Sequence, residues 1–291
     1  FAAVWTGDNM AKWSHLEISI PMCLSLAVSG ISFCGADVGG FFLNTEDELL
    51  VRWYQTGAWL PFFRAHAHDA TSRREPYLKA PDKLDVIRTA LQQRYSYLPF
   101  WYLCFREHEL TGVPVILPLF AEFPGEEAVF GIEDQFLVGG KILVKPVTKA
   151  NIKSVPVYLP GGPEEIWVNI NNKLVYPANN KVETSATIDL VPVFHRGGTV
   201  IPKKERARPS STSMMNDPYT LVVTVNRNKT AYGDLYSDDG QSYDYKKGSF
   251  VHQSYKFEKN RLISKTVNSA IRFDNSEMLE RVRIWNPPQG V

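Results

Sequence analysis

The sequence predicts an α/β segment, the C-terminal portion of a (β/α)8 TIM barrel, followed by an all-β part made of antiparallel β-sandwich domains. Strand-like and helix-like stretches alternate up to about residue 112. Three polar residues follow the first three predicted strands at equal intervals. Beyond Gly112, short runs of alternating apolar residues are broken by turn residues, as in β-hairpins.

The chain begins with two predicted strands separated by one helix. The run AAVWT, at residues 2–6, predicts a buried strand. Apolar residues then recur at helical spacing from Trp13 to Val28, and Gly30 is a helix stop signal. The run ISFCGAD, at residues 31–37, predicts the next strand.

A second helix, a third strand and a long helical stretch complete this part. Thr45 and Glu48 predict a capping box (T-x-x-E) at the start of the second helix. The run WLPFFRAH, at residues 59–66, predicts a third strand. After a loop rich in Arg, Glu and Pro, residues 82–110 predict one long helix that bends near Pro99.

The polar residues that follow the three strands are evenly spaced. Asp8, Asp37 and His66 follow one another at intervals of 29 residues. A βα unit takes roughly 30 residues, so the spacing predicts successive units that present one residue each at the same end. In a (β/α)8 barrel that end carries the active site. Three units cannot close a barrel of eight, so we expect this chain to be the later part of a longer polypeptide.

The rest of the chain predicts two β domains. The runs FLVGGKILVKPV, VPVYLPGGPEEIW and VPVFHRGGTVIPK, at residues 136–147, 155–167 and 191–203, each predict a hairpin. A polar stretch then separates a second β set, which ends in one more strand and a turn at residues 280–291. We therefore divide the chain into the barrel part, a first sandwich and a second sandwich, at residues 1–117, 118–205 and 206–291.

The composition excludes several classes of protein. The 291 residues are 44% hydrophobic and 22% charged, with a formal net charge of +1, as is ordinary for a globular protein. A net charge near zero argues against a nucleic acid or an anionic membrane as partner. No apolar run approaches the roughly 18 residues that would span a bilayer.

The three cysteines leave two arrangements open. Cys23 and Cys34 are close enough in sequence to form a disulfide, which would leave Cys104 single and require an oxidising compartment. Alternatively, all three are buried thiols. Asn228 begins an N-x-T glycosylation sequon, which is usable only if the chain is secreted.

Asp8 is the first candidate for catalysis. It stands on a glycine turn between Trp5 and Trp13. An aspartate in such a turn more commonly caps a helix or closes the turn. Aromatic walls, however, remove water from a carboxyl group and favour its protonated form, which a general acid requires.

Asp37, Phe41 and the histidines after the third strand also have two interpretations each. Asp37 is either a turn residue or a ligand contact, and Phe41 is either core or a wall on which a sugar stacks. The H-x-H pair of His66 and His68 would suit a metal hydrolase. A metal would need further ligands after neighbouring strands, so a histidine that hydrogen-bonds a substrate hydroxyl fits better.

Six motifs together resemble glycoside hydrolase family 31: VWTGDN, GADVGGFF, RWYQTGAWLPFFRAHAH, RREPY, QRYSYLPFWY and PVFHRGGTVIP. The resemblance implies the back half of a (β/α)8 barrel followed by proximal and distal β-sandwich domains. It implies hydrolysis with retention of anomeric configuration, without a cofactor or a metal. It matches Asp8 to the family's general acid/base.

The same resemblance assigns the surrounding residues. Trp5, Phe41 and His66 match residues that line the subsite for the terminal glucose, and Asp37 matches a position beside that pocket. Cys23 and Cys34 match a pair that is bridged in related enzymes. The family's nucleophile lies on an earlier strand that nothing here matches. The chain is therefore expected to supply the acid/base but not the nucleophile, and to be inactive without the N-terminal part of the same polypeptide.

Two functions follow as expectations from the resemblance, and the missing nucleophile leaves a third one open. The first is exo-acting removal of terminal α1,3-linked glucose from high-mannose N-glycans in the lumen of the endoplasmic reticulum, together with a non-catalytic β subunit. The second is hydrolysis of short α-glucans. The third, of another class, is a catalytically silent, glycosidase-like subunit or sugar-binding module.

Overall fold

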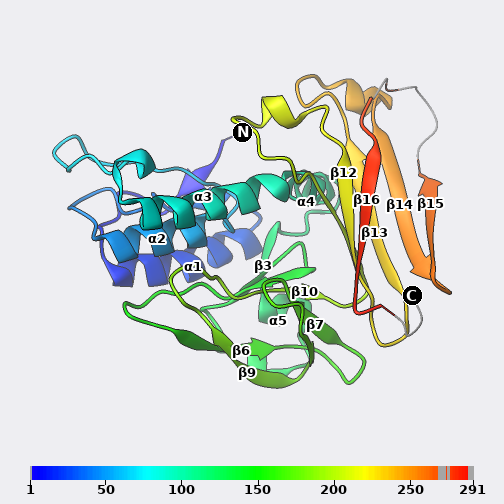
Figure 1. Ribbon diagram of the computed structural model, residues 1–291, viewed down its shortest axis with the longest axis horizontal. Helices are drawn as coiled ribbons and strands as arrows, with labels where there is room; N and C mark the ends of the chain where they lie inside the picture. Colours follow the sequence, from blue (N-terminus) through cyan, green and yellow to red (C-terminus); the bar gives the residue numbers. More distant parts are fainter. Residues whose placement is uncertain (1, 268–272, 274–275, 288–291) are drawn as a thin grey trace.

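The computed structural model describes residues 2–267, 273 and 276–287. Figure 1 shows the helices of the first part of the chain stacked beside two β regions, one that contains β6 and β9 and one that contains β12 to β16. The end of the predicted tail, residues 288–291, lies outside the described residues. Within the described part, no helix has the length and apolar character needed to cross a membrane.

The chain begins with the predicted βαβ unit. Strands β1 (Val4–Trp5) and β2 (Cys34–Gly35) pair in parallel, and helix α1 (Trp13–Val28) connects them. The helix has the bounds that the apolar spacing predicted. The strands are only two residues long, which is shorter than the runs that predicted them. Their parallel pairing nevertheless brings the residues that follow each strand to the same edge.

The predicted capping box at α2 (Asp47–Gly57) is wrong. The residue that precedes the helix is Glu46, and its side chain makes no capping hydrogen bond. The Thr45 hydroxyl instead donates to the carbonyl of Glu46, at 3.2 Å. The Glu48 carboxylate accepts from the backbone N–H of Asn151, at 2.9 Å. Asp47 and Glu48 in the first turn of α2 still stabilise the helix, because their negative charges lie near the positive end of the helix dipole.

The predicted third strand at residues 59–66 does not form as a strand. At its start, the Arg94 guanidinium donates to the carbonyls of Leu60 and Pro61, at 2.7 Å each. Pro61 has no N–H to give to a ladder. Further along, the segment still runs parallel to the β2 segment: the N–H of Phe62 donates to the carbonyl of Cys34, at 3.0 Å, the N–H of Val38 donates to the carbonyl of Arg64, at 2.9 Å, and Asp37 and Arg64 form a bridge.

The predicted single long helix is two helices, α3 (Pro81–Ser96) and α4 (Leu98–Thr111), which are separated at Tyr97, two residues before Pro99. Pro99 falls in the first turn of α4, where its missing N–H costs no helical hydrogen bond. Helix α4 packs on strands β11 and β13 of the C-terminal sheet. It therefore joins the barrel part to the end of the chain.

The first β region contains a sheet with the order β3-β4-β5-β10-β7-β8 and a separate β6–β9 pair. The hairpin predicted at residues 136–147 is confirmed as β4–β5. The hairpin predicted at residues 155–167 is wrong, because β6 pairs with β9, and β7 pairs with β8 and β10. Its connection contains two prolines and is longer than a tight hairpin turn. The bounds are β3 (Ile116–Pro118), α5 (Leu119–Glu122), β4 (Phe136–Val138), β5 (Ile142–Val144), β6 (Ser154–Leu159), β7 (Ile166–Asn169), β8 (Val175–Pro177), β9 (Asn180–Ser185) and β10 (Val193–Arg196).

The second β region is a sheet with the order β15-β14-β13-β11-β12-β16. Most neighbours are antiparallel, but the β11–β13 and β12–β16 pairs are parallel. The predicted last strand is confirmed as β16. The bounds are β11 (Thr199–Lys203), β12 (Tyr219–Thr224), β13 (Ala231–Ser237), β14 (Val251–Glu258), β15 (Arg261–Thr266) and β16 (Leu279–Trp285).

The hairpin predicted at residues 191–203 is wrong, because β10 and β11 belong to different sheets. The two glycines between β10 and β11 hydrogen-bond to strands of different sheets. Gly197 donates its N–H to the carbonyl of Ile166, at 2.8 Å, and Gly198 donates to Thr224, at 2.7 Å. A side chain at Gly197 would lie 2.4 Å from Ile166, so only glycine fits at this crossing.

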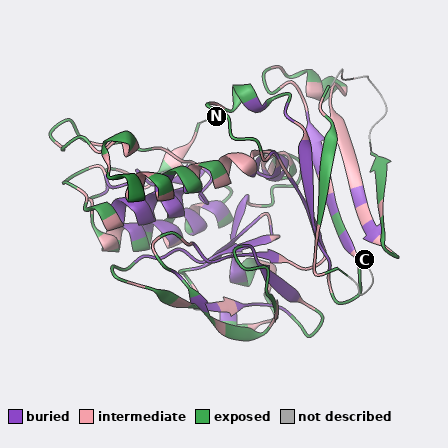
Figure 2. Ribbon diagram, in the orientation of Figure 1, coloured by how far each residue is buried: buried purple, intermediate pink, exposed green. Residues whose placement is uncertain are grey.

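Buried side chains link the parts. Figure 2 shows burial concentrated where helices and sheets face one another. Arg52 on α2 is almost fully buried and donates to several carbonyls of the first β region, including Ala186 at 2.6 Å and Leu190 at 3.1 Å. This guanidinium fastens the barrel part to that region by charge-assisted hydrogen bonds.

Candidate active site

Asp8 lies in the loop that follows β1, and its side chain is exposed. The neighbouring Asn9 is buried and holds the loop in place. Its side chain donates to the carbonyl of Asp37, at 3.2 Å, and accepts from the N–H of Phe41, at 2.8 Å. The Asp8 loop is thus tied to the loop after β2, while the Asp8 carboxylate is left free to meet a ligand.

The two tryptophans beside Asp8 have different positions. Trp5 is 44% exposed, at the end of β1. Trp13 packs against the core cluster between α1 and α2, and its indole N–H donates to Glu46, at 2.6 Å. The sequence suggested that both would flank Asp8. Only Trp5 is left to form a wall for a ligand.

Asp37 is fully buried and is paired with Arg64. The Asp37 carboxylate accepts hydrogen bonds from Nε and Nη2 of Arg64, at 3.0 and 2.5 Å. Burial raises the pKa of Asp37, and the hydrogen bonds from Arg64 oppose this shift. The guanidinium carbon of Arg64 lies 5.0 Å from the centre of the Trp5 ring. Arg64 therefore lies between the buried Asp37 carboxylate and the Trp5 ring.

Phe41 and His66 form the other side of the site. Their ring centres lie 5.2 Å apart, and the His66 ring is exposed. The N–H of His68 donates to the carbonyl of Phe41, at 3.0 Å, which holds the two segments side by side. Phe42 extends this aromatic surface, with its ring centre 5.5 Å from that of His68.

The structure brings together the five residues that the sequence suggested for substrate and catalysis: Trp5, Asp8, Asp37, Phe41 and His66. Asn9, the neighbour of Asp8, bonds the carbonyl of Asp37 and the N–H of Phe41, and the Phe41 ring faces that of His66, so the segments spaced at 29-residue intervals meet at one edge. Within the described residues, no cluster of three or more His, Cys, Asp or Glu side chains is arranged to hold a metal ion.

Three residues of the site were missed by sequence reasoning. Asn9 directly follows Asp8, and Arg64 lies two residues before His66. Arg74 lies in the RREPY motif. Nothing in the amino-acid sequence distinguishes the role of Arg74 from that of Arg73. For Asn9, the available signal in the sequence was its place directly after Asp8 in the VWTGDN motif.

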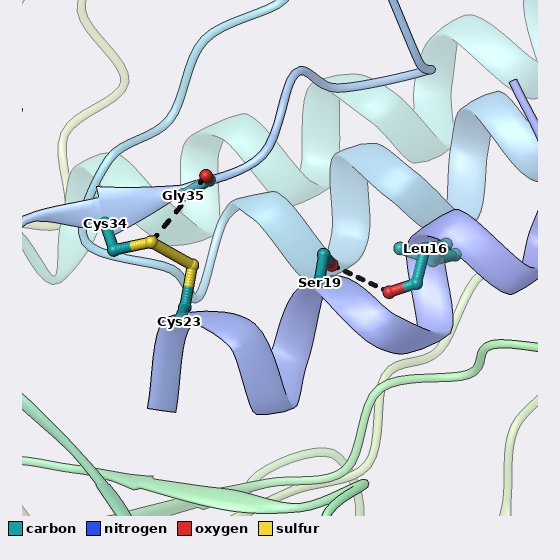
Figure 3. The surroundings of a disulfide bond; sticks show 5 residues. All are labelled: Leu16, Ser19, Cys23, Cys34 and Gly35. Atoms are coloured by element: carbon teal, nitrogen blue, oxygen red, sulfur yellow. Dashed lines mark hydrogen bonds between the residues drawn. A yellow bond between two sulfur atoms is a disulfide. The ribbon is translucent and has the colours of Figure 1, made fainter. Parts of the chain in front are cut away.

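Cys23 and Cys34 form a disulfide that joins α1 to β2, with their Cα atoms 5.5 Å apart (Figure 3). Both residues are fully buried in the barrel part. Cys104 is a buried free thiol, and burial raises its pKa to about 12. The disulfide anchors the strand that leads into Asp37, and Cys104 is kept protonated.

Comparison with known proteins agrees with this architecture. Residues 1–104 match the glycosyl hydrolases family 31 TIM-barrel domain, and residues 112–201 match the glycosyl hydrolase family 31 C-terminal domain. The chain therefore belongs to glycoside hydrolase family 31. The predicted fold class, a C-terminal barrel portion followed by β-sandwich domains, is confirmed.

Individual relatives are similar over nearly the whole chain. Neutral alpha-glucosidase AB of Sus scrofa is 49% identical over 98% of this chain and 30% of its own length. A probable glucan 1,3-alpha-glucosidase of Oryza sativa subsp. japonica is 47% identical over 100% of this chain and 32% of its own. Neutral alpha-glucosidase C of Mus musculus is 42% identical over 98% of this chain and 32% of its own length. The chain thus spans about a third of the length of these relatives.

Solved structures show the same similarity. A glucosidase II α subunit bound to α3-Glc2 superposes with a TM-score of 0.94 and 41% identity, over 99% of this chain and 32% of that one. An endoplasmic-reticulum glucosidase II complex of the catalytic subunit with the binding domain of the regulatory subunit superposes with a TM-score of 0.93 and 41% identity. This match covers 97% of this chain and 31% of that one.

Proposed function

We propose that this chain is the acid/base-bearing part of a retaining α-glucosidase of the glucosidase II type. The observation that carries the proposal is the exposed Asp8 carboxylate. It stands on a loop that hydrogen-bonds the Phe41 segment, beside exposed Trp5 and His66, in a chain of family 31. An acid beside an aromatic wall and a polar ring suits a sugar, which offers apolar faces and hydroxyl groups.

Retention requires two carboxyl groups about 5 to 5.5 Å apart. In the first step a carboxylate attacks the anomeric carbon, the glycosidic C–O bond breaks, and Asp8 donates its proton to the leaving oxygen. In the second step Asp8 takes a proton from the water that displaces the carboxylate. Asp37 is not available as the nucleophile, because it is fully buried and bound to Arg64. The nucleophile would come from a preceding segment of the same polypeptide.

The substrate would be terminal α1,3-linked glucose on high-mannose N-glycans, and the enzyme would work in the endoplasmic reticulum lumen with a non-catalytic β subunit. Support comes from the relatives whose names specify a 1,3-linkage and from the heterodimeric glucosidase II structure. The buried disulfide suits an oxidising compartment. Hydrolysis of short α-glucans, as by a neutral alpha-glucosidase C, is the second candidate, and its lower identity of 42% makes it the weaker one.

The test is glucose release from a chromogenic α-glucoside and from a glucosylated N-glycan by the complete polypeptide that carries this chain. Asp8→Asn should lower turnover by about 10²- to 10⁴-fold while the protein stays folded. Asp82→Asn, an exposed carboxylate at the start of α3, is the matched control and should be unaffected. Wild-type rates in Asp8→Asn would refute the acid/base role. An inactive wild-type protein would favour the silent-subunit alternative.

A further inference from the structure

We propose that Arg74 is a positioning residue, which holds the loops bearing Asp8, Phe41 and His66 in one arrangement. The inference rests on the proposed function, because it deepens the same site. Arg74 lies in the loop before α3 and belongs to no part of the acid/base machinery described above.

The Arg74 guanidinium binds two different loops at once. Its Nη1 donates to the carbonyl of Gly39, at 2.7 Å, and its Nη2 donates to the carbonyls of Gly40 and His66, the latter at 2.8 Å. Gly40 immediately precedes Phe41. The guanidinium therefore fixes the distance between the backbone of Phe41 and that of His66, whose rings form one side of the site.

The same glycines carry the constraint to Asp8. Gly40 packs so closely on the backbone of Met10 and Ala11 that a Cβ atom there would lie 2.3 Å from the Ala11 nitrogen. Gly39 and Gly40 have φ angles of 88° and 84°, a backbone conformation that residues with a side chain rarely adopt. Movement of the Gly39–Gly40 turn would thus displace the loop that begins at Asp8.

The charge of Arg74 has no ion-pair partner among the described residues. Its donors go to backbone carbonyls instead, and burial lowers its pKa. Arg74 is half-buried, and the three carbonyls that it binds belong to loops of the site, so its role lies in the geometry it imposes. Arg73, the next residue, is the opposite case: it is exposed and pairs with Glu75, at 2.9 Å. Two adjacent arginines therefore offer a matched comparison.

Lysine cannot reproduce this contact, because its single ammonium lacks the planar fork that reaches carbonyls on two loops. The experiment compares Arg74→Lys and Arg74→Ala with Arg73→Lys in the complete polypeptide. We measure kcat and KM on an α-glucoside and the Kd of the glucose-shaped iminosugar deoxynojirimycin. Displacement of reacting groups by about 1 Å costs on the order of 10²-fold, so Arg74→Lys should lower kcat/KM by about 10- to 100-fold.

Arg73→Lys should stay within about twofold of wild type, because exposed ion pairs contribute little. Added guanidinium should restore part of the activity of Arg74→Ala and none of that of Arg74→Lys, in which the ammonium occupies the site. Near-wild-type kcat/KM and iminosugar affinity in both Arg74 variants would overturn the proposal, while an active wild type would leave the proposed function intact.

A second readout is independent of activity. The N–H groups of Phe41 and Phe42 both donate to the carbonyl of Asn9, at 2.7 and 2.9 Å. If Arg74 positions these loops, hydrogen exchange at both amides should accelerate about tenfold in Arg74→Lys and stay unchanged in Arg73→Lys. Unchanged exchange in Arg74→Lys would refute the positioning role even if the wild-type protein released no glucose.

Discussion

The Asp37 carboxylate and the Arg64 guanidinium form a buried pair at the edge where β1 and β2 end, with two hydrogen bonds at 3.0 and 2.5 Å. The Arg64 guanidinium also lies over the Trp5 ring, with its carbon 5.0 Å from the ring centre. The carboxylate is fully buried and the arginine side chain is 35% exposed. A charge in the core is thereby coupled to the orientation of an aromatic wall.

Removal of Arg64 should therefore destabilise the protein more than removal of the pair. Arg64→Met leaves an uncompensated carboxylate in the core and should cost about 3 kcal/mol, the lower end of the range for a broken buried pair, because part of Arg64 is exposed. Thermal unfolding measures the effect. The double variant Asp37→Asn with Arg64→Met should recover part of the loss, and a double variant less stable than Arg64→Met would contradict this account.

His66→Ala should weaken glucose or iminosugar binding by about tenfold, since it removes the ring that faces Phe41 and one hydrogen-bonding group. Isothermal titration calorimetry of the complete polypeptide checks this result. His108→Ala is the matched control, because His108 lies on α4 and its ring bonds the carbonyl of Val113, at 2.9 Å. Stoichiometric metal in the purified protein, lost in His66→Ala, would instead support the metal-hydrolase alternative.

His195 makes stability depend on pH. It is fully buried, bonded to the Tyr97 hydroxyl at 2.8 Å, stacked on Trp285, and its pKa lies well below the usual value because of burial and then the charges of Lys203 and Lys173. In the unfolded chain it regains a pKa of about 6.5. Below that pH the unfolded chain binds a proton that the folded protein does not. The free energy of unfolding should therefore fall as pH decreases, by up to about 1.4 kcal/mol per pH unit from this group.

Urea midpoints measured between neutral and mildly acid pH check the contribution of His195. His195→Gln cannot titrate, and its amide can still bond the Tyr97 hydroxyl. The variant should be less stable than wild type at neutral pH, where the ring stacks on Trp285, and the difference should shrink as pH falls. Parallel pH dependences for the two proteins would show that His195 does not titrate on unfolding.

The Cys23–Cys34 disulfide should contribute about 2 to 4 kcal/mol to stability, because the link between α1 and β2 restricts the conformations of the unfolded chain. Cys23→Ser should lower the thermal midpoint and free the thiol of Cys34. Titration of this chain's thiols after denaturation without reductant should detect only Cys104 in the wild type. Reactive Cys23 and Cys34 under those conditions would show that the bridge does not form.

Several features were predictable because their causes are local. Helix α1 has its expected bounds because apolar residues recur at helical spacing from Trp13 to Val28 and Gly30 follows. The candidate site was predictable in outline because successive parallel βα units repeat at a near-constant length, so equal spacing placed Asp8, Asp37 and His66 at one edge. The division at residues 117 and 205 remains a prediction.

Other features depend on partners that are distant in the sequence. The sequence Gly197–Gly198 is typical of a hairpin turn, yet its two N–H groups donate to the carbonyls of Ile166 and Thr224, which belong to different sheets. Residues 59–66 look like one strand, yet Arg94 binds the carbonyls of Leu60 and Pro61 at its start. Arg73 and Arg74 are equivalent as letters, and only the fold gives one of them three carbonyls and the other a carboxylate in solvent.

The sequence by itself thus determined the family, through motifs that resemble it, and the alternation of strands and helices at the start of the chain, which follows from local spacing and residue type. The tertiary structure alone decided which groups pair. A backbone or side-chain polar group that is buried must find a partner wherever the fold supplies one, and that choice is not written in the neighbouring residues.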